Sequence, residues 1–409
     1  MESETVPAHA VASLTRDELT IARKTLEAMV PQRLPALEGI DMASLYLPCE
    51  RLCGDLFDVK QIADDVLAFV MFDVACHGIS SVLVASMAKV TFTNHLRHTS
   101  SPQAVIDHVN TDMAKYLSAT SVMTAFVGYL DLHSNKLTYC NAGHPYPMVF
   151  RTKDKSLEPL KTAGVFLGIS EKWAYEEKTV YLNPGDWLVM FTNGFYGLFD
   201  DTNKKKGRER FEQELPSLLE GKTPGEFIRQ CGGLQRRKAD KGEFSDDVAI
   251  VAVEILTESR RNLIKHELGF EWEDPVYMQF ISYFEEMDNA IGIVLKSMDN
   301  QGYADDTIRK MKITLTELIV NALYHGNRKE PSKKVIIGHI IDKQKAVVSI
   351  MDEGDGFDPS AVPDPTLPEN LVKDSGRGLY IVRCYVDDLT FNKRGNRVTV
   401  SKKFDLQVS

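Results

Sequence analysis

The sequence lacks the features of a membrane-spanning or exported protein. A membrane-spanning helix needs about 18 consecutive apolar residues, and the longest apolar run, Val66–Ala75, is interrupted by Asp73. The N-terminus, Met1–Ala12, is polar and lacks the positively charged start of a secretory signal. We therefore expect a cytoplasmic protein.

The sequence also lacks a cysteine framework. Its six cysteines follow no zinc or disulfide spacing: Cys49, Cys53, Cys76, Cys140, Cys231 and Cys384. Cys49 and Cys53 resemble half of a zinc site, but no second pair follows them. Reduced thiols in a cytosolic protein are the simpler interpretation.

A long basic block is absent as well. The chain has 48 Lys and Arg against 58 Asp and Glu, a net charge of −10, which argues against nucleic acid or a membrane as a partner. It contains no internal repeat and no low-complexity tract. Its 409 residues have an ordinary globular composition and suffice for about two or three domains.

The first part of the chain is predicted to be an α+β domain. A helix over 13–30 comes first and ends at Pro31 and Pro35; it either docks on its own domain or pairs two protomers into a homodimer. Short β-like runs with two grouped helices then occupy 40–255, which favours α+β over a doubly wound sheet. The basic segment Asn203–Arg210 is predicted to be a surface loop.

A second α/β sandwich is predicted beyond a charged stretch with few apolar residues. Its expected helices are 276–297, 305–324 and 378–385, and its expected strands are 334–341, 346–352, 388–392 and 397–402. The predicted boundaries are 1–35 for an N-terminal linker or switch helix, 36–256 for the first domain, 257–273 for a linker and 274–409 for the second domain.

One polar cluster of the second domain lies on a predicted helix. Glu317, Asn321 and His325 (or Tyr324) share one helix face. An amide oxygen is a hard ligand for Mg²⁺, and a carboxylate can hold a water or take a proton, so the face suits a magnesium–triphosphate site. A solvated polar face is the simpler alternative.

Two glycine-rich clusters follow. Asp352 ends a predicted strand and can accept a hydrogen bond from an exocyclic amine, while Gly354 and Gly356 let the backbone pass close to a planar base. Gly376 and Gly378 open a helix whose free N–H groups point at phosphates. Each cluster alone is also compatible with a tight turn.

Taken in this order, the three clusters resemble the N, G1 and G2 boxes of the GHKL ATPase superfamily. The resemblance implies a Bergerat-type α/β sandwich that binds ATP and Mg²⁺. Asn321 would hold Mg²⁺, Asp352 would bind the adenine amine, and 359–374 would form a lid. The other implied ATP-binding residues are His325, Gly354, Gly356, Gly376, Gly378 and Leu379.

The residues around the three motifs indicate which branch of this superfamily the second domain resembles. A histidine kinase needs a helical hairpin with a phosphoacceptor histidine, and no coiled-coil repeat surrounds His266. The segment from Glu317 to Asn327 resembles the corresponding motif of the RsbW/SpoIIAB anti-sigma serine kinases instead. That resemblance implies Glu317 as general base, a STAS-domain anti-sigma-factor antagonist as substrate and a sigma factor as a further partner.

Acidic residues also recur at predicted strand ends in the first domain. Asp55 and Asp58 precede or begin one run, Asp73 ends another, and Asp246 and Asp247 precede a third. Carboxylates gathered by distant strands can bind two hard cations and activate water for phosphoester hydrolysis. Ordinary strand-terminal turns, which favour Asp, are the simpler alternative.

The first domain resembles the SpoIIE/RsbU branch of the PPM-type metal-dependent protein phosphatases, a β-sandwich flanked by helices. The resemblance includes Gly54-Asp55, Asp73-Val74, Asn141-Ala-Gly-His144-Pro145, Pro184-Gly-Asp186 and Asp246-Asp247. It implies that Asp55, Asp73, Asp246 and the carbonyl of Val74 hold Mn²⁺ or Mg²⁺. In many relatives a receiver or sensor domain precedes this region, so the signal is expected from a partner or from a longer chain.

The first domain departs from this family where a carboxylate is usual. Asn193 stands in place of a metal-ligating aspartate, and Gly197 replaces a glutamate. Asn193 can still coordinate through its amide oxygen, but it lacks the charge, so one metal should bind more weakly. Cys53 and Cys76 also replace usual glycines.

Two interpretations of the whole chain stay open at this point. In the first, a kinase domain and a phosphatase domain act on the same antagonist in a bacterial partner-switching pathway. In the second, a pseudophosphatase is joined to a nucleotide-gated module that sequesters its partner. A third, a GHKL ATPase without a protein substrate, is disfavoured, because the sequence shows no transducer domain coupled to it.

Overall fold

The computed structural model describes residues 20–21, 23–31, 34–35, 37, 39–48, 54–63, 65–75, 79–117, 122–170, 172–200, 203–239, 247–330, 333–358 and 377–405. The chain forms two compact units, Met1–Pro35 with Ile40–Ile255, and Ala36–Gly39 with Leu256–Ser409. Both are α+β, so the predicted fold class is confirmed. Among the described residues, no helix is long and apolar enough to cross a bilayer.

Two antiparallel sheets form the first unit. One has the strand order β1 (Ile40–Leu47), β10 (Val248–Ile255), β9 (Trp187–Phe191), β6 (Met148–Arg151), β7 (Ser156–Pro159). The other has the order β2 (Leu56–Ala63), β3 (Val66–Val74), β4 (Met123–Asp131), β5 (Lys136–Ala142), β8 (Glu177–Tyr181). Every residue of β9 and of β10 is buried, as expected for a strand covered on both faces.

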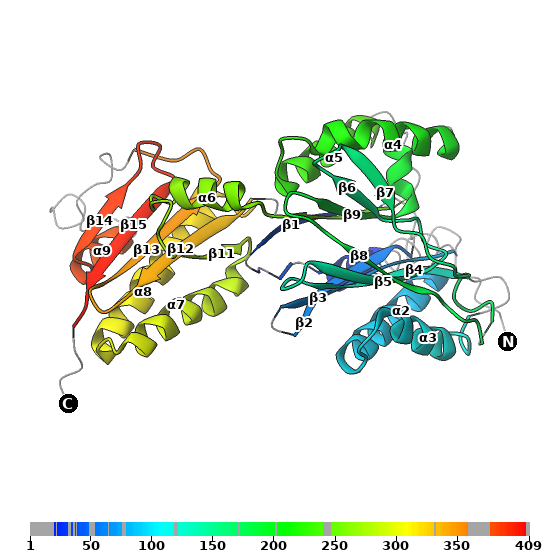
Figure 1. Ribbon diagram of the computed structural model, residues 1–409, viewed down its shortest axis with the longest axis horizontal. Helices are drawn as coiled ribbons and strands as arrows, with labels where there is room; N and C mark the ends of the chain where they lie inside the picture. Colours follow the sequence, from blue (N-terminus) through cyan, green and yellow to red (C-terminus); the bar gives the residue numbers. More distant parts are fainter. Residues whose placement is uncertain are drawn as a thin grey trace, which may run out of the picture. The chain divides into compact units, whose positions relative to one another are not determined.

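Helices cover the outer face of each sheet in the first unit (Figure 1). α2 (Ile79–His98) and α3 (Pro102–Met113) contact β2, β3, β4 and β5, whereas α4 (Lys204–Leu219) and α5 (Pro224–Ala239) contact β1, β7 and β10. Of the predicted N-terminal helix, 20–21 and 23–29 are helical, and 13–19 lie outside the described residues.

The segment predicted to be a loop, Asn203–Arg210, instead begins α4. The Asn203 side chain caps this helix by accepting hydrogen bonds from the N–H groups of Lys205 and Lys206, at 3.0 and 3.1 Å. Phe211 and Leu215 are fully buried about two and three turns later. The prediction was wrong because the basic residues lie on the exposed face of a helix whose other face packs on the core.

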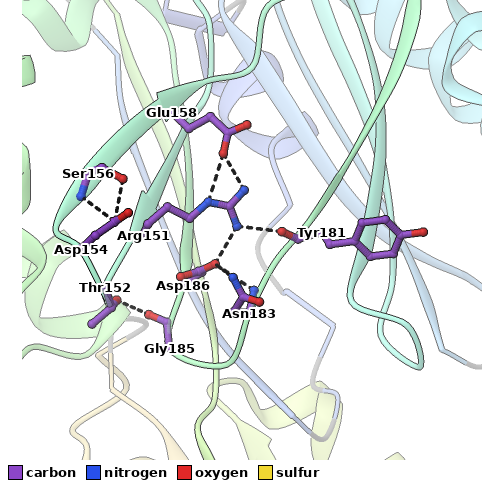
Figure 2. Close-up of polar contacts among 9 residues, drawn as sticks. All are labelled: Arg151, Thr152, Asp154, Ser156, Glu158, Tyr181, Asn183, Gly185 and Asp186. Atoms are coloured by element: carbon purple, nitrogen blue, oxygen red, sulfur yellow. Dashed lines mark hydrogen bonds and ion pairs between the residues drawn. The ribbon is translucent and has the colours of Figure 1, made fainter.

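A hydrogen-bonded arginine joins the hairpin of β6 and β7 to the segment that leads into β9 (Figure 2). Arg151 donates to Asp186 at 2.7 Å and to Glu158 at 3.0 Å, and Asp186 also accepts from the N–H of Asn183 at 2.8 Å. Gly185 has a φ of +92°, which only glycine adopts without strain. The Pro184-Gly-Asp186 motif therefore builds a turn and contributes no ligand.

The second unit is one five-stranded sheet with helices on both faces. The strand order is β11 (Tyr277–Ile281), β12 (Val335–Ile341), β13 (Lys345–Asp352), β15 (Arg397–Lys403), β14 (Asp388–Phe391). One core contains residues from this sheet and from α7 (Met287–Gln301), α8 (Asp305–Asn321) and α9 (Arg377–Tyr385). The opposite face packs against α6 (Glu258–Glu267), which is visible in Figure 1.

Two segments of the second unit differ from expectation. The first part of the helix predicted over 276–297 is strand β11, because Met278 and Phe280 alternate toward the α6 side of the sheet. The segment 257–273, predicted to be a linker, contains α6 and a turn that packs on the sheet: Leu268 is fully buried, and its carbonyl accepts a hydrogen bond from Ser349 at 2.7 Å.

Candidate functional sites

The second unit contains a cavity of about 580 Å³ between α8, α9 and the ends of β13 and β15. This volume lies in the range of small-molecule sites, about 300–1,000 Å³. Seven of the predicted ATP-site residues line it: Glu317, Asn321, His325, Asp352, Gly356, Gly378 and Leu379. Gly354 lies beside it, and Gly376 and the predicted lid 359–374 lie outside the described residues.

α8 supplies the first side of the cavity. Leu315, Leu318 and Ile319 are buried in the core, which turns Glu317 and Asn321 toward the cavity. The helix has Asp305 and Asp306 in its first turn, where carboxylates favour the positive helix end. The predicted shared face of Glu317 and Asn321 is thus observed.

A wider helical turn follows α8. Residues Ala322–Gly326 form a π-helical turn, and the Asn327 N–H donates to the Ala322 carbonyl at 2.8 Å. His325 lines the cavity, whereas the Tyr324 ring packs against Phe284 with centroids 6.0 Å apart. Between the two residues that the sequence left open, the structure therefore puts His325 at the cavity.

The start of α9 approaches the Glu317 side chain of α8 closely at Gly378. A Cβ atom at Gly378 would overlap Oε2 of Glu317 and would lie 3.2 Å from its Cδ atom. No other residue type fits there without displacing the carboxylate. The glycine predicted from a phosphate-binding pattern thus also sets how closely the helix start approaches Glu317.

Asp352, at the end of β13, provides a hydrogen-bond acceptor inside the cavity. The Gly354 N–H donates to one carboxylate oxygen at 2.8 Å, and no hydrogen bond reaches the other oxygen within the described part of the chain. Burial raises the pKa of Asp352, and the Gly354 hydrogen bond opposes that shift. A Cβ atom at Gly326 would lie 2.5 Å from the bonded oxygen, so a glycine packs directly on this carboxyl group.

The charges at the cavity fit a nucleotide with a divalent cation. Glu317, Asp352 and Asp355 are acidic, and Arg328 and Arg397 are basic, so the lining does not neutralise a triphosphate. Arg328 pairs with Asp355 at 3.3 Å. The carboxylate and amide oxygens of Glu317 and Asn321 are of the type that Mg²⁺ prefers.

Several lining residues escaped the sequence analysis. Phe357, Phe391 and Asn396 line the cavity and come from the loop after β13 and from the β14–β15 hairpin. The rings of Phe357 and Phe391 meet edge to face, with centroids 5.6 Å apart. Their spacing in the sequence gives no signal, because only the sheet order brings this hairpin beside β13.

The first unit gathers polar residues at one edge of both sheets. Asp55 precedes β2, Asp73 and Val74 end β3, Asn193 follows β9 and Asp247 precedes β10. Asn193 Nδ2 donates to Asp73 Oδ2 at 3.0 Å, and this bond joins the two sheets. A Cβ atom at Gly54 would lie 3.1 Å from the Val74 carbonyl oxygen, so the backbone that leads into Asp55 passes close to that carbonyl. Asp246 lies outside the described residues.

An aromatic cluster fixes the segment that carries Asn193. This residue begins the turn η1 (Asn193–Leu198), in which Phe195 is fully buried. The Phe195 ring lies 5.6 Å from Phe191 and 5.3 Å from Phe211, measured between centroids. Asn193 is therefore held by β9 and α4 together.

The donor set fits a divalent cation, with fewer charges than a two-metal site normally has. Asn193 Oδ1 is buried and accepts no hydrogen bond in the part of the chain that the structure describes. It is an oxygen suited to a cation, as are the carboxylate of the buried Asp55 and the Val74 carbonyl. Among the described residues, however, no three His, Cys, Asp or Glu side chains form a metal-binding group.

Two other polar residues of the first unit have structural roles. Asp58 is buried and pairs with Lys89 at 2.9 Å and Lys60 at 3.1 Å, so it is not a ligand. Burial lowers the pKa of Lys89, and Asp58 opposes that shift. Burial also lowers the pKa of His144 to about 3, so its ring is neutral; it bonds Thr124 at 2.9 Å.

Comparisons with known proteins match the two units separately. Residues 63–256 match the family model of stage II sporulation protein E, and residues 283–402 match that of the histidine kinase-like ATPase domain. The phosphoserine phosphatase RsbU of Bacillus subtilis is 24% identical over 179 residues, which cover 44% of this chain and 53% of that protein. The serine-protein kinase RsbW of Oceanobacillus iheyensis is 25% identical over 111 residues, covering 25% of this chain and 70% of that protein.

A solved structure shows the same fold for the first unit. The SiaA PP2C domain of Pseudomonas aeruginosa has a TM-score of 0.50 at 18% identity, covering 61% of this chain and 99% of that domain. The chain spans about half the length of RsbU, 53%. The predicted family resemblances are confirmed: this chain joins a SpoIIE/PP2C-type phosphatase domain to an RsbW-like histidine kinase-like ATPase domain.

Proposed function

We propose that this protein is a bifunctional regulator of a bacterial partner-switching pathway. Its second domain phosphorylates a serine or threonine of a STAS-domain anti-sigma-factor antagonist, and its first domain removes that phosphate. The observation that carries the proposal is the convergence of Glu317, Asn321, His325 and Asp352 on one cavity of about 580 Å³. The names of the relatives, a phosphoserine phosphatase and a serine-protein kinase, support the two directions.

In the kinase reaction Glu317 acts as the general base. It takes the proton of the partner's hydroxyl while that oxygen bonds to the terminal phosphorus of ATP and ADP leaves. Asp352 accepts a hydrogen bond from the adenine amine through its second oxygen, and Asn321 is the residue that would hold Mg²⁺. When bound, Mg²⁺ neutralises the charge of the phosphates.

In the phosphatase reaction the sheet edge of the first unit binds the phosphorylated serine. Asp55, Asp73, the Val74 carbonyl and Asn193 are the described groups that would hold Mn²⁺ or Mg²⁺, together with Asp246. Such ions supply a water nucleophile of lowered pKa. The buried, unbonded Oδ1 of Asn193 supports its inclusion among the ligands.

A second candidate function has its own supporting observation. The Asn193 amide donates to Asp73, which places a neutral donor where an additional charge would serve a second cation. In this alternative the first domain is a pseudophosphatase, and the second domain sequesters the antagonist or a sigma factor in response to nucleotide. The two candidates differ in whether phosphate is transferred.

The test is a transfer assay with the full chain, labelled ATP, Mg²⁺ and a candidate STAS protein. Label should move to a serine or threonine, and Glu317→Ala and Asn321→Ala should abolish the transfer. Lys312→Ala, an exposed position on α8 outside the cavity, is the matched control. Transfer that persists in both active-site variants would refute the kinase assignment, and partner binding without transfer would favour the alternative.

A further inference from the structure

The turn between β14 and β15 packs on the loop that follows Asp352. Gly356 and Gly395 have φ angles of +81° and +74°. A Cβ atom at Gly356 would overlap the Arg394 carbonyl oxygen, and one at Gly395 would overlap that of Phe357. The Arg394 guanidinium also donates to the Gly354 carbonyl at 2.8 Å. The two loops therefore approach at backbone distance, which only glycines allow.

Two asparagine side chains fasten this turn to Asp352. Asn396 Nδ2 donates to the Asp352 carbonyl oxygen at 2.7 Å, and the Asp352 N–H donates to the Asn396 carbonyl at 2.9 Å. Asn392 Nδ2 donates to Asn396 Oδ1 at 2.9 Å, while Asn392 Oδ1 accepts from the Asn396 N–H at 3.1 Å. Asn396 is 8% exposed and lines the cavity, so these bonds form out of bulk water.

The backbone of Asp352 is thus held on both of its polar groups, next to the side chain that faces the cavity. One carboxylate oxygen is bonded to the Gly354 N–H. The direction of the other oxygen depends on the orientation of the Asp352 backbone, because aspartate has only two side-chain torsions. A small rotation of that backbone would move the oxygen away from a planar base.

We propose that Asn396, held by Asn392, is a positioning residue that makes the cavity selective for adenine over 6-oxopurines. It fixes Asp352 so that the free oxygen accepts from the exocyclic amine of adenine and repels the carbonyl of a 6-oxopurine. The inference rests on the proposed binding of ATP at this cavity. It adds a determinant of base selectivity that lies in the hairpin turn, outside the glycine boxes.

The experiment compares ATP with inosine triphosphate, in which a carbonyl oxygen replaces the adenine amine. Calorimetric titrations of the full chain in Mg²⁺ give the two dissociation constants and their ratio. The variants are Asn396→Ala, which removes both amide bonds, and Asn396→Asp, which keeps the shape but loses the Nδ2 donor. Asn392→Ala releases Asn396 without altering the residue at the cavity. Asn300→Ala, exposed on α7, is the control.

The wild type and Asn300→Ala should bind ATP more tightly than inosine triphosphate. In the Asn396 variants ATP affinity should fall about tenfold, the effect of one hydrogen bond to a charged group. Inosine triphosphate affinity should change little, so the ratio should approach one; Asn392→Ala should show an intermediate ratio. The same pattern in Asn392→Ala also tests the proposal should the Asn396 variants fail to fold.

Two results would overturn the proposal, and they differ in meaning. Equal losses for both nucleotides, with the wild-type ratio kept, would show that the asparagines only stabilise the hairpin, and the assignment of Asp352 would stand. A wild type that binds neither nucleotide, or binds both equally, would refute adenine recognition by Asp352 itself, and the role of Asn396 would fall with it.

Discussion

The two sites of this chain are built in different ways. The cavity of the second unit depends on close contacts: Gly326 packs on the Asp352 carboxyl, and Gly378 packs on that of Glu317. The sheet edge of the first unit depends on charged and polar groups at strand ends, with a hydrogen bond from Asn193 to Asp73 between two sheets. We therefore expect the second site to be sensitive to added volume and the first to be sensitive to charge.

The largest expected effect tests whether the two sites act independently. Glu317→Gln should reduce phosphotransfer by about 100-fold or more, the usual contribution of a general base, and leave dephosphorylation unchanged. Asp73→Asn should have the reverse effect, because it removes a carboxylate from the metal ligands. Transfer and release of labelled phosphate would be followed separately with the same partner. Loss of both activities in either variant would contradict independence.

The next prediction tests the role of charge in the first unit. Asn193→Asp changes the charge at nearly constant volume, so Mn²⁺ affinity should rise about tenfold or more, together with dephosphorylation. Among the described residues, no atom lies within 4 Å of a Cβ atom built at Gly197, so Gly197→Glu can be added with room for the start of its side chain. Calorimetric titration with Mn²⁺ measures the affinity. An unchanged affinity in Asn193→Asp would show that this residue does not face the metal.

A smaller effect should separate backbone strain from added volume in the second unit. Gly356 and Gly302 both have positive φ angles, +81° and +88°, but a Cβ atom at Gly302 has open space whereas one at Gly356 would overlap the Arg394 carbonyl oxygen. Gly302→Ala should cost about 1 kcal/mol of unfolding free energy from strain alone. Gly356→Ala should cost about 3 kcal/mol. Scanning calorimetry would measure the midpoint temperature of the unfolding transition that ATP shifts upward. Equal decreases of this temperature in the two variants would contradict the role of close contact.

The smallest expected effect is a pH dependence of nucleotide binding. Burial raises the pKa of Asp352 above its ordinary value of 3.8, and the ionised carboxylate is the form that accepts from the adenine amine. ATP affinity should therefore have its full value at pH values above the raised pKa of Asp352. It should decrease by a few fold as the pH falls through that pKa. Asp352→Asn should bind ATP weakly at every pH. A wild-type affinity that stays constant down to the ordinary aspartate range would argue against this role.

Much of the fold follows from local patterns. The continuous apolar runs of β3, β9 and β10 and the helical periodicity of α2 and α8 match the observed elements. The elements that the sequence analysis missed include α4 and β11, which share a reason. The local sequence patterns of α4, which starts with basic residues, and of the short β11 are obscured by their neighbours. Their conformation is decided by the burial of Phe211 in α4 and of Phe280 in β11 against distant segments.

The groups available at each site could be predicted from the residues alone: Glu317, Asn321 and Asp352 with their glycines, and Asp55, Asp73 and Asn193 at strand ends. Which of these groups meet depends on the packing of the folded chain. It turned His325 rather than Tyr324 to the cavity through a π-helical turn, directed the Asn193 amide to Asp73, and brought Asn396 to the Asp352 backbone. The physical reason is that each of these contacts joins segments that only the sheet order and the packing of the core bring together.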